Sequence, residues 1–341
     1  MPEKKSNSAN ERSGLVDGFG RVHTDLRISV TDRCNLRCTY CMPAEGVQFR
    51  SHREVMTYEE IERFVRVAAR LGISKLRLTG GEPLVRKGVV RLVEMLVAVP
   101  GIEEVAMTTN GILLAQYAEA LKAAGLARLN VSLDTLDPQR FQQIARYEGL
   151  SQVLEGLETA RRAGFERTKL NALAMRNSSE DDVVPLAEFA RREGYELRFI
   201  EFMPLDGDRQ WSGGEVLSGR EILDLLERGI GPLEPISAEG SSSPATTYRF
   251  VDGGGRIGVI PSVSEPFCEY CDRLRLTADG RVRNCLFATS KWDTLALMRA
   301  EADDEQLAQL IQAAVAAKRK TRGTDDGEFG RSDRSMHQIG G

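Results

Sequence analysis

The stretch DLRISVTDRCNLRCTYCMP, residues 25–43, joins a short β-type run to three closely spaced cysteines. Cys34, Cys38 and Cys41 have the spacing CxxxCxxC, so one short loop presents three thiols. A cubane iron–sulfur cluster has four irons, and soluble ferredoxins normally close each iron with a cysteine. Three thiols without a fourth nearby leave one iron open to a ligand that is not protein, which predicts chemistry at this loop.

The alternative for this loop is a structural zinc site, since closely spaced cysteines also suit tetrahedral Zn²⁺. Structural zinc takes four closed ligands, usually from two CxxC-like pairs. A single triplet with a three-residue gap suits zinc poorly, so the spacing favours a cluster.

The composition is that of a protein with an ordinary core and no bias towards polyanionic partners. The chain has 341 residues, 41% of them hydrophobic, and a formal net charge of −4. This length accommodates one large α/β domain, or one domain with an appendage. The charge predicts no binding to nucleic acid, and the lack of long apolar runs predicts no membrane span.

The six cysteines fall into two tight groups, which leaves none for scattered disulfides. This is the pattern of a reducing compartment in which thiols serve as metal ligands. The first residues also lack the apolar stretch of a signal peptide. We therefore expect a cytoplasmic protein.

Short β-rich runs alternate with helical patterns from residue 25 onward. The expected strands cover residues 26–30, 75–79, 104–109, 128–133, 168–174 and 196–202. One helix begins at the capping box Thr57-Tyr58-Glu59-Glu60 and stops at Gly72, and later helices end at Gly125, Gly164 and Gly194. Six βα units predict a parallel sheet with right-handed crossovers, and eight would be needed for a closed barrel. The expected fold is therefore α/β, an open six-unit βα barrel of the TIM type.

Polar or glycine-rich steps follow the expected strands at the rim where their carboxyl ends meet. The first strand leads into the cysteine loop, the second into Thr79-Gly80-Gly81-Glu82-Pro83, and the third into Thr108-Thr109-Asn110-Gly111. Functional groups of parallel α/β barrels gather at this rim. The coincidence predicts one shared pocket.

Composition along the chain predicts four parts. Residues 1–20 are expected to form a loose polar tail, and residues 21–235 the βα barrel. After a Gly/Ser-rich stretch, residues 236–325 are expected to close the barrel, with β-type runs at 246–251 and 256–260 and helices at 291–300 and 304–322. Residues 326–341 are expected to form a flexible tail ending in Gly340 and Gly341.

A second group of three cysteines lies in the region after the barrel. Cys268 and Cys271 form CxxC, and Cys285 follows after a hairpin-like turn. Zinc completed by another residue and a second iron–sulfur cluster are both compatible with this spacing. The presence of two three-cysteine groups in one chain favours a second cluster with its own open iron.

Four arginines, Arg273, Arg275, Arg281 and Arg283, lie between these cysteines. Alternation along a strand puts Arg273 and Arg275 on one face. Guanidinium groups bind phosphate through two hydrogen bonds and keep their charge. A solvated basic strand is the ordinary explanation for isolated arginines, but this density beside three thiols predicts an anion pocket for a nucleotide.

These residues together resemble two nested families. The CxxxCxxC loop matches the signature of the radical S-adenosylmethionine (SAM) enzymes, in which SAM chelates the open iron. Within them, the chain resembles the GTP 3′,8-cyclases, also called molybdenum cofactor biosynthesis protein A, over residues 19–287. The most specific matches are residues 25–34, the Thr-Gly-Gly-Glu-Pro step and the run FCEYCDRLRL at residues 267–276.

The resemblance implies two [4Fe-4S] clusters and roles for individual positions. The first cluster would bind SAM and be held by Cys34, Cys38 and Cys41, and the second would bind substrate and be held by Cys268, Cys271 and Cys285. The positions that match SAM contacts are Tyr40, Gly81, Ser132 and Met203. The positions that match GTP contacts are Arg27, Arg77, Thr108, Lys169, Arg273, Leu274 and Arg275. Gly340 and Gly341 match a family tail that enters the pocket and assists the reaction, and Asp272 stands where the family commonly has asparagine.

The activity that the resemblance implies is that of a radical SAM cyclase of the carbon–carbon lyase class. A 5′-deoxyadenosyl radical would remove the hydrogen at C3′ of GTP, and C3′ would add to C8 of guanine. The product would be (8S)-3′,8-cyclo-7,8-dihydroguanosine 5′-triphosphate, in the first step of molybdenum cofactor biosynthesis. The implied partners are an external one-electron reductant and a downstream cyclic pyranopterin monophosphate synthase, and the implied assembly is a monomer or homodimer.

Two other functions stay open on the residues alone. One is a different radical SAM maturase with an auxiliary cluster, although such proteins usually have more cysteines in their carboxyl-terminal portion. The other is a non-catalytic regulator that binds zinc and a nucleotide. Metal analysis distinguishes zinc from iron, and incubation with SAM and GTP distinguishes the enzymes.

Overall fold

The computed structural model describes residues 14–207, 211–236, 243–289, 291–321 and 332–340. In this part of the chain, twelve strands form one open sheet in the order β12-β11-β10-β1-β2-β3-β4-β5-β6-β9-β8-β7. The strands are β1 (Asp25–Ser29), β2 (Lys75–Thr79), β3 (Glu104–Thr109), β4 (Arg128–Ser132), β5 (Lys169–Ala174), β6 (Glu196–Glu201), β7 (Leu233–Pro235), β8 (Thr246–Phe250), β9 (Arg256–Ile260), β10 (Arg273–Leu276), β11 (Arg281–Arg283) and β12 (Trp292–Asp293).

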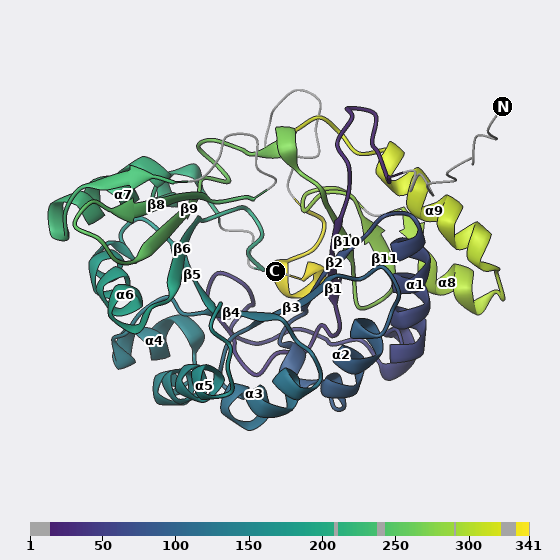
Figure 1. The fold of residues 1–341 in the computed structure, drawn as a ribbon, viewed down its shortest axis with the longest axis horizontal. Coiled ribbons are helices and arrows are strands. Elements are labelled where there is room, and N and C mark those ends of the chain that lie inside the picture. The colour runs from purple at the N-terminus through teal and green to yellow at the C-terminus, as the bar shows by residue number, and fades with distance from the viewer. Residues whose placement is uncertain (1–13, 208–210, 237–242, 290, 322–331, 341) are drawn as a thin grey trace, which may run out of the picture.

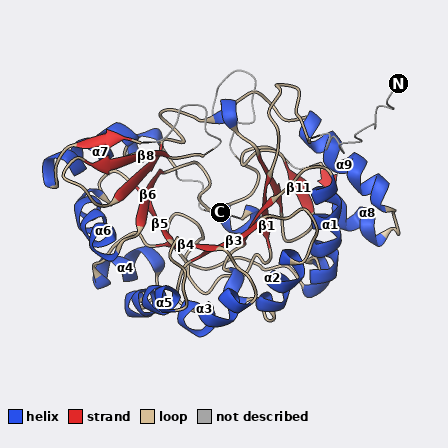
Figure 2. Cartoon of the chain, in the orientation of Figure 1, coloured by secondary structure: helices blue, strands red, loops and turns tan. Residues whose placement is uncertain are grey.

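The sheet is strongly curved, and the longer helices cover its outer side (Figure 1). Figure 2 shows the same layering, with the helices outside and the carboxyl-terminal end of the chain inside the curve. The helices are α1 (Tyr58–Arg70), α2 (Val89–Val97), α3 (Leu114–Ala123), α4 (Pro138–Ala145), α5 (Leu150–Arg162), α6 (Glu180–Glu193), α7 (Gly219–Gly229), α8 (Thr294–Arg299), α9 (Asp304–Ala316) and the short α10 (Met336–Ile339). Four 3₁₀ turns are η1 (His52–Glu54), η2 (Pro83–Val85), η3 (Gly213–Glu215) and η4 (Cys268–Tyr270). None of these helices is long and apolar enough to cross a membrane.

The helix boundaries follow the local signals in the sequence. Thr57 accepts a hydrogen bond from the backbone N–H of Glu60, and the Glu60 carboxylate accepts one from the backbone N–H of Thr57. This reciprocal pair satisfies two donors at the start of α1, which confirms the expected capping box. Gly125, Gly164 and Gly194 follow α3, α5 and α6 with φ of 91°, 88° and 79°, a backbone region that favours glycine.

Strands β1 to β6 pair in parallel in chain order, as the alternating pattern predicts. The sheet does not close, because β12 and β7 are its two edge strands. The later region extends it on both sides, since β10 pairs in parallel with β1 and β9 pairs in parallel with β6. The sequence predicted β-type runs there but not their partners, because strand propensity does not encode which edge a strand joins.

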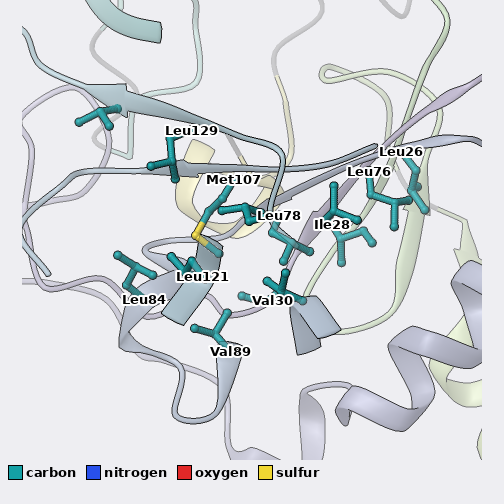
Figure 3. Packing of buried hydrophobic residues seen from close by; sticks show 14 of the residues in the cluster. Leu26, Ile28, Val30, Leu76, Leu78, Leu84, Val89, Met107, Leu121 and Leu129 are labelled. Atoms are coloured by element: carbon teal, nitrogen blue, oxygen red, sulfur yellow. The ribbon is translucent and has the colours of Figure 1, made fainter. Parts of the chain in front are cut away.

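The core lies between the sheet and the helices outside it. Ile28 of β1 is in register with Leu78 of β2, which is in register with Met107 of β3, and each of these side chains is 0% exposed. Figure 3 shows these apolar side chains packed with Val89 of α2 and Leu121 of α3. Because side chains alternate along a strand, the intervening residues of β1 to β3 face the inner side of the curve.

The described residues near both chain ends are packed, which differs from the expected tails. Leu15 is buried, and its carbonyl accepts a hydrogen bond from the backbone N–H of His23. In the last described segment, residues 332–340, Ile339 is fully buried. Composition indicated loose ends because both segments are short and polar, but each packs against elements distant in the chain. Residues 1–13, 322–331 and 341 lie outside the described residues.

Candidate active site

The register of the sheet places arginines in a row on its inner face. Arg27 of β1 lies opposite Arg275 of β10 and Arg77 of β2. At the adjacent position Leu26 pairs with Leu274, and both side chains are buried in the apolar core. Because Leu274 points into the core, its neighbours Arg273 and Arg275 both face the inner side of the sheet, which confirms the predicted shared face. Leu274, assigned to GTP by resemblance, points its side chain away from the arginines.

A large cavity of about 620 Å³ lies on the inner face of the sheet. Nine Lys and Arg side chains line it against four Asp and Glu side chains, counted over the described residues. The sequence-predicted residues in its wall are Arg27, Tyr40, Arg77, Thr108, Ser132, Lys169, Met203, Cys268, Cys271, Arg273, Arg275 and Cys285. This excess of positive charge suits a polyanionic ligand.

The arginines of this cavity destabilise one another in the absence of an anion. Burial lowers the pKa of Arg77 to about 9, and the positive charge of Arg27 contributes to the shift. Burial likewise lowers the pKa of Arg27 and of Arg275. The Nε atoms of Arg27, Arg77 and Arg273 are buried without a hydrogen-bond partner among the described residues. Buried donors without partners beside like charges are the arrangement expected where phosphate oxygens bind.

Other basic residues in the cavity were missed from the sequence. Lys75 of β2 and Arg198 of β6 line it, each two residues from another charged residue of the same strand. Alternating charge along these strands was the signal that could have identified them. Lys169, whose need for an anionic partner was expected, forms a 2.8 Å ion pair with Glu196.

A smaller cavity of about 150 Å³ is lined by the first cysteine group and by Gly81. The loop of Cys34, Cys38 and Cys41 is held in place by α4, because the backbone N–H of Thr39 donates to the Ile144 carbonyl at 2.9 Å. A turn inside the loop is closed by the bond from the Cys41 N–H to the Cys38 carbonyl, also at 2.9 Å. The three thiols of one cavity thus come from a single constrained loop, as the spacing predicted.

Gly81 permits the close packing of the second strand end against this loop. A Cβ atom at Gly81 would lie 2.4 Å from the Arg33 carbonyl oxygen, which is well inside contact distance. Next to it, the Glu82 carboxylate accepts hydrogen bonds from Leu84, Thr109 and Asn110. Burial raises the pKa of Glu82 to about 7. The glycine-rich step therefore fixes the wall of the small cavity.

The first three thiols have the chemistry of metal ligands rather than of disulfides. The structure describes all six cysteines, and none of them forms a disulfide. Burial raises the pKa of the Cys34 thiol to about 11 and that of Cys41 to about 12. A buried thiol of this kind ionises readily only when a metal displaces its proton. The donor set therefore fits iron ligation.

The second cysteine group, Cys268, Cys271 and Cys285, lines the large cavity beside the arginines. Burial raises the pKa of the Cys271 thiol, but the positive charges of Arg273 and Lys318 outweigh burial and lower it to about 7. This environment stabilises a thiolate, the form that ligates metal.

The described residues offer no ready donor set for a single zinc ion. Among the residues that the structure describes, no three His, Cys, Asp or Glu side chains converge on a point that one metal ion could occupy. Structural zinc needs four such donors at about 2.0–2.3 Å from the ion. A cubane cluster instead takes its cysteines on separate irons, so its three thiols stand further apart.

The two cavities adjoin, and five residues line both of them. These residues are Tyr40, Thr108, Ser132, Asp134 and Met336. The Tyr40 hydroxyl donates to the Asp134 carboxylate at 2.7 Å, which fixes the aromatic ring between the two cavities. The pocket that the rim residues predicted is therefore a pair of adjoining cavities. Each of them contains one cysteine group.

The carboxyl-terminal segment, residues 332–340, lies between the cysteine groups. The backbone N–H of His337 donates to the Cys41 thiol, and the Gly340 carbonyl accepts a hydrogen bond from Arg275. Arg334 binds Asp279 through two hydrogen bonds of 2.8 and 2.9 Å. Gly340 therefore lies at the arginine row, whereas Gly341 is outside the described residues.

Two of the four arginines between the second cysteines do not line the cavity. Arg283 is fully buried and forms a 2.7 Å ion pair with Asp333 of the carboxyl-terminal segment. Arg281 forms a 3.0 Å ion pair with Asp293. The expected four-arginine anion pocket is corrected to Arg273 and Arg275, because β11 lies beyond β10 towards the edge of the sheet and its two arginines pair with Asp293 and Asp333 instead. Asp272, the departure from the family, lines the cavity.

Comparison with known families divides the chain into two matching regions. Residues 28–190 match the radical SAM superfamily, and residues 195–324 match the family described as Molybdenum Cofactor Synthesis C. The first region contains the first cysteine group and the second region contains the other.

Curated relatives extend over nearly the whole chain. The GTP 3′,8-cyclase of Rhodopirellula baltica is 50% identical over 330 residues, which cover 96% of this chain and 92% of that protein. The GTP 3′,8-cyclase of Streptomyces coelicolor is 46% identical over 340 residues, which cover 99% of each chain.

The fold is also similar to that of a solved radical SAM structure. Streptococcus suis SuiB bound to S-adenosylmethionine matches with a TM-score of 0.59 and 15% identity, over 85% of this chain and 68% of that chain. At this identity the match concerns the fold alone. Because relatives of nearly full length share 50% and 46% of their residues with it, the chain belongs to the GTP 3′,8-cyclase family of radical SAM enzymes.

Proposed function

We propose that this protein converts GTP to (8S)-3′,8-cyclo-7,8-dihydroguanosine 5′-triphosphate, in the first step of molybdenum cofactor biosynthesis. The relatives named GTP 3′,8-cyclase support this activity and do not favour the maturase or the zinc-binding regulator. The observation that carries the proposal is the pair of adjoining cavities, each lined by three cysteines, one of them also lined by arginines whose buried Nε atoms lack hydrogen-bond partners among the described residues.

Two [4Fe-4S] clusters fit the two cysteine groups. We assign the SAM-binding cluster to Cys34, Cys38 and Cys41, and the substrate-binding cluster to Cys268, Cys271 and Cys285. When bound, the first cluster and SAM supply the 5′-deoxyadenosyl radical that removes the hydrogen at C3′ of GTP. The resulting C3′ radical would add to C8 of guanine and close the new ring, and one further electron from the external reductant, with a proton from solvent, would give the 7,8-dihydro product.

The protein's own contribution is binding, orientation and exclusion of water. Arg27, Arg77 and Arg275 form the row assigned to the triphosphate, because they lie side by side on the inner face, and the Nε atoms of Arg27 and Arg77 are buried without a hydrogen-bond partner among the described residues. Lys169 and Thr108 are assigned to GTP, and Tyr40, Gly81, Ser132 and Met203 to SAM. Tyr40 and Ser132 line both cavities, which supports contact with a SAM molecule that reaches from one cluster to the substrate.

Gly340 is assigned to the reaction as part of the carboxyl-terminal segment. Its carbonyl accepts a hydrogen bond from Arg275, and Met336 of the same segment lines both cavities. A segment in this position excludes water from a radical reaction and orients the arginine. Gly341 is assigned to the same role by family resemblance.

The main test is anaerobic reconstitution followed by identification of the product. About eight irons per chain are expected for two cubane clusters. Incubation with SAM, GTP and dithionite should yield the cyclised nucleotide together with 5′-deoxyadenosine. Cys34→Ser should abolish SAM cleavage, whereas Arg273→Ala should weaken GTP binding and leave uncoupled SAM cleavage. Undiminished cyclisation in either variant would contradict the assignment.

The remaining partners follow from the chemistry of the reaction. Reductive SAM cleavage requires an external one-electron donor, and the product requires a downstream synthase that forms cyclic pyranopterin monophosphate. We propose a cytoplasmic location, which is supported by the six described cysteines, none of which forms a disulfide. A monomer or homodimer is proposed, to be tested by sedimentation of the reconstituted protein.

A further inference from the structure

Lys318 is a buried lysine directly behind the second cysteine group. The residue comes two positions after the end of α9 and is not part of the cavity wall. It is only 5% exposed. The ammonium donates to the Arg273 carbonyl at 2.8 Å and to the Cys271 thiol at 3.4 Å. Burial lowers the pKa of Lys318, and the nearby sulfurs of Cys271 and Cys285 oppose this shift. The ammonium is therefore paired with a sulfur assigned to the second cluster and with a backbone carbonyl.

Several contacts fix the position of this lysine relative to the cysteine loops. Arg21 donates to the Cys268 carbonyl at 2.7 Å, and its other nitrogen donates to the Arg319 carbonyl at 2.8 Å. Asp17 holds the Arg21 guanidinium at 2.6 Å. These bonds connect the loop that contains Cys268 to the chain that immediately follows Lys318.

The third cysteine of the group is connected to the same helix. Asn284, the residue before Cys285, donates its side-chain amide to the Ala314 carbonyl of α9 at 2.8 Å. Both cysteine loops are thus hydrogen-bonded to the carboxyl-terminal end of α9 or to the residues after it. The contact between Lys318 and Cys271 is fixed by the surrounding packing, because separate hydrogen bonds hold the cysteine loops and the chain around Lys318 in place.

Among the residues that the structure describes, no lysine or arginine side chain donates a hydrogen bond to a sulfur of the first cysteine group. Its sulfurs accept from neutral groups: Cys34 from the Leu36 backbone at 3.4 Å and the Asn110 amide at 3.8 Å, and Cys41 from the His337 backbone. Hydrogen bonds and charges at ligand sulfurs tune the reduction potential of a cluster. A positive charge favours the reduced cluster, which has one more negative charge, and therefore raises its potential.

We propose that Lys318 is a positioning residue whose ammonium hydrogen-bonds the Cys271 ligand and raises the reduction potential of the second cluster. The proposal rests on the proposed function, in which this cysteine group holds a [4Fe-4S] cluster. It distinguishes the two clusters by their hydrogen bonds: a sulfur of the second group accepts from an ammonium, whereas the described donors to Cys34 and Cys41 are neutral and Arg37 acts on Cys34 through its charge alone.

The test compares Lys318→Met and Lys318→Gln with the matched control Lys320→Met. Lys320 is exposed and contributes only its backbone carbonyl to Arg21, so its side chain is dispensable for these contacts. Each full-length protein is reconstituted anaerobically, its iron is counted, and both clusters are titrated with dithionite under electron paramagnetic resonance. Added SAM perturbs the signal of the first cluster and so identifies it.

The expected result is a lower potential for the second cluster in both Lys318 variants. At a fixed applied potential, the ratio of reduced to oxidised second cluster should fall about tenfold, equivalent to about 59 mV for a one-electron couple. Glutamine retains a donor without the charge, so an equal loss in both variants identifies the charge as the cause. The first cluster should titrate as in the control.

Each other outcome also decides the question. Variants that keep about eight irons and titrate like Lys320→Met overturn the proposal. Folded variants that lose about four irons while the control keeps them support it, because the ammonium is then needed to hold the ligand. If both variants unfold by circular dichroism, Lys318 is a packing residue and the proposal fails. A wild-type protein with only four irons would instead contradict the proposed function.

Discussion

Gly81 is the position at which one added methyl group would most directly disturb the first cysteine loop. An alanine Cβ there would lie 2.4 Å from the Arg33 carbonyl oxygen, which is backbone and can move only with the loop. Gly81→Ala should therefore destabilise the fold by about 1–3 kcal/mol and reduce SAM cleavage at least tenfold. The measurements are urea unfolding and the yield of 5′-deoxyadenosine.

The matched control for this change is Gly18→Ala. A Cβ at Gly18 meets no heavy atom within 4 Å, so this variant should behave like the wild type. Equal stability and equal SAM cleavage in the two variants would show that the close approach at Gly81 has no functional consequence.

His23 makes stability depend on pH in the weakly acidic range. Burial lowers the pKa of this fully buried histidine to about 4, and the charge of Lys318 adds to the shift. Between about pH 6.5 and pH 4 the unfolded chain therefore binds a proton that the folded protein does not. The free energy of unfolding should fall as the pH falls, by about 2 kcal/mol at pH 5 from this residue alone.

The check is the change in Tm between pH 7 and pH 5 for wild type and His23→Asn. Asparagine does not titrate and can still donate to the Arg21 carbonyl, which His23 contacts at 3.0 Å. The wild-type Tm should fall by a few degrees more than that of the variant. Parallel falls in both proteins would exclude His23 as the source.

The carboxyl-terminal segment, residues 332–340, is the element whose position depends most on a few ion pairs. Arg334 is largely buried and binds Asp279 in a two-bond pair, a geometry that is stronger than a single hydrogen bond. Arg334→Met should release the segment and increase hydrogen exchange at residues 336–340 about tenfold to hundredfold, or about 1.4–2.8 kcal/mol. Product formation should fall with it, while the iron content stays unchanged.

Arg281→Met provides the comparison for this element. Arg281 lies 3.8 Å from the same Asp279 carboxylate, but its closer partner is Asp293 at 3.0 Å, outside the segment. Exchange at residues 336–340 should stay slow in this variant. Slow exchange in Arg334→Met as well would mean that the remaining contacts, such as the burial of Ile339 and the ion pair of Arg283 with Asp333, are sufficient to hold the segment.

The two cysteine groups line separate, adjoining cavities, and no cysteine lines both of them. Cys285→Ser should therefore lose about four of about eight irons and keep the first cluster. SAM cleavage should persist, whereas GTP binding and cyclisation should be lost. Iron analysis and product assays check this, and loss of both clusters would show that the cavities assemble cooperatively.

Much of the architecture could be predicted because its signals are local. The second and third strands were expected at residues 75–79 and 104–109, and the structure has them there. Glycines with positive φ end the helices as expected, because few other residues adopt that conformation. The packed end segment at residues 332–340 could not be predicted, because its composition alone does not reveal its distant partners Asp279 and Arg283.

The sequence alone was sufficient for both cysteine groups, the open βα sheet and the shared face of Arg273 and Arg275. The spacing of cysteine ligands and the alternation of side chains along a strand depend on residues close together in the chain. Both can therefore be recognised in the sequence without a structure. Only the tertiary structure decided that β9 and β10 extend the sheet and that the carboxyl-terminal segment lies between the cavities. It also decided that Arg21 meets the Lys320 carbonyl 299 residues away, beside Lys318. Such contacts depend on the packing of whole elements, which no local pattern encodes.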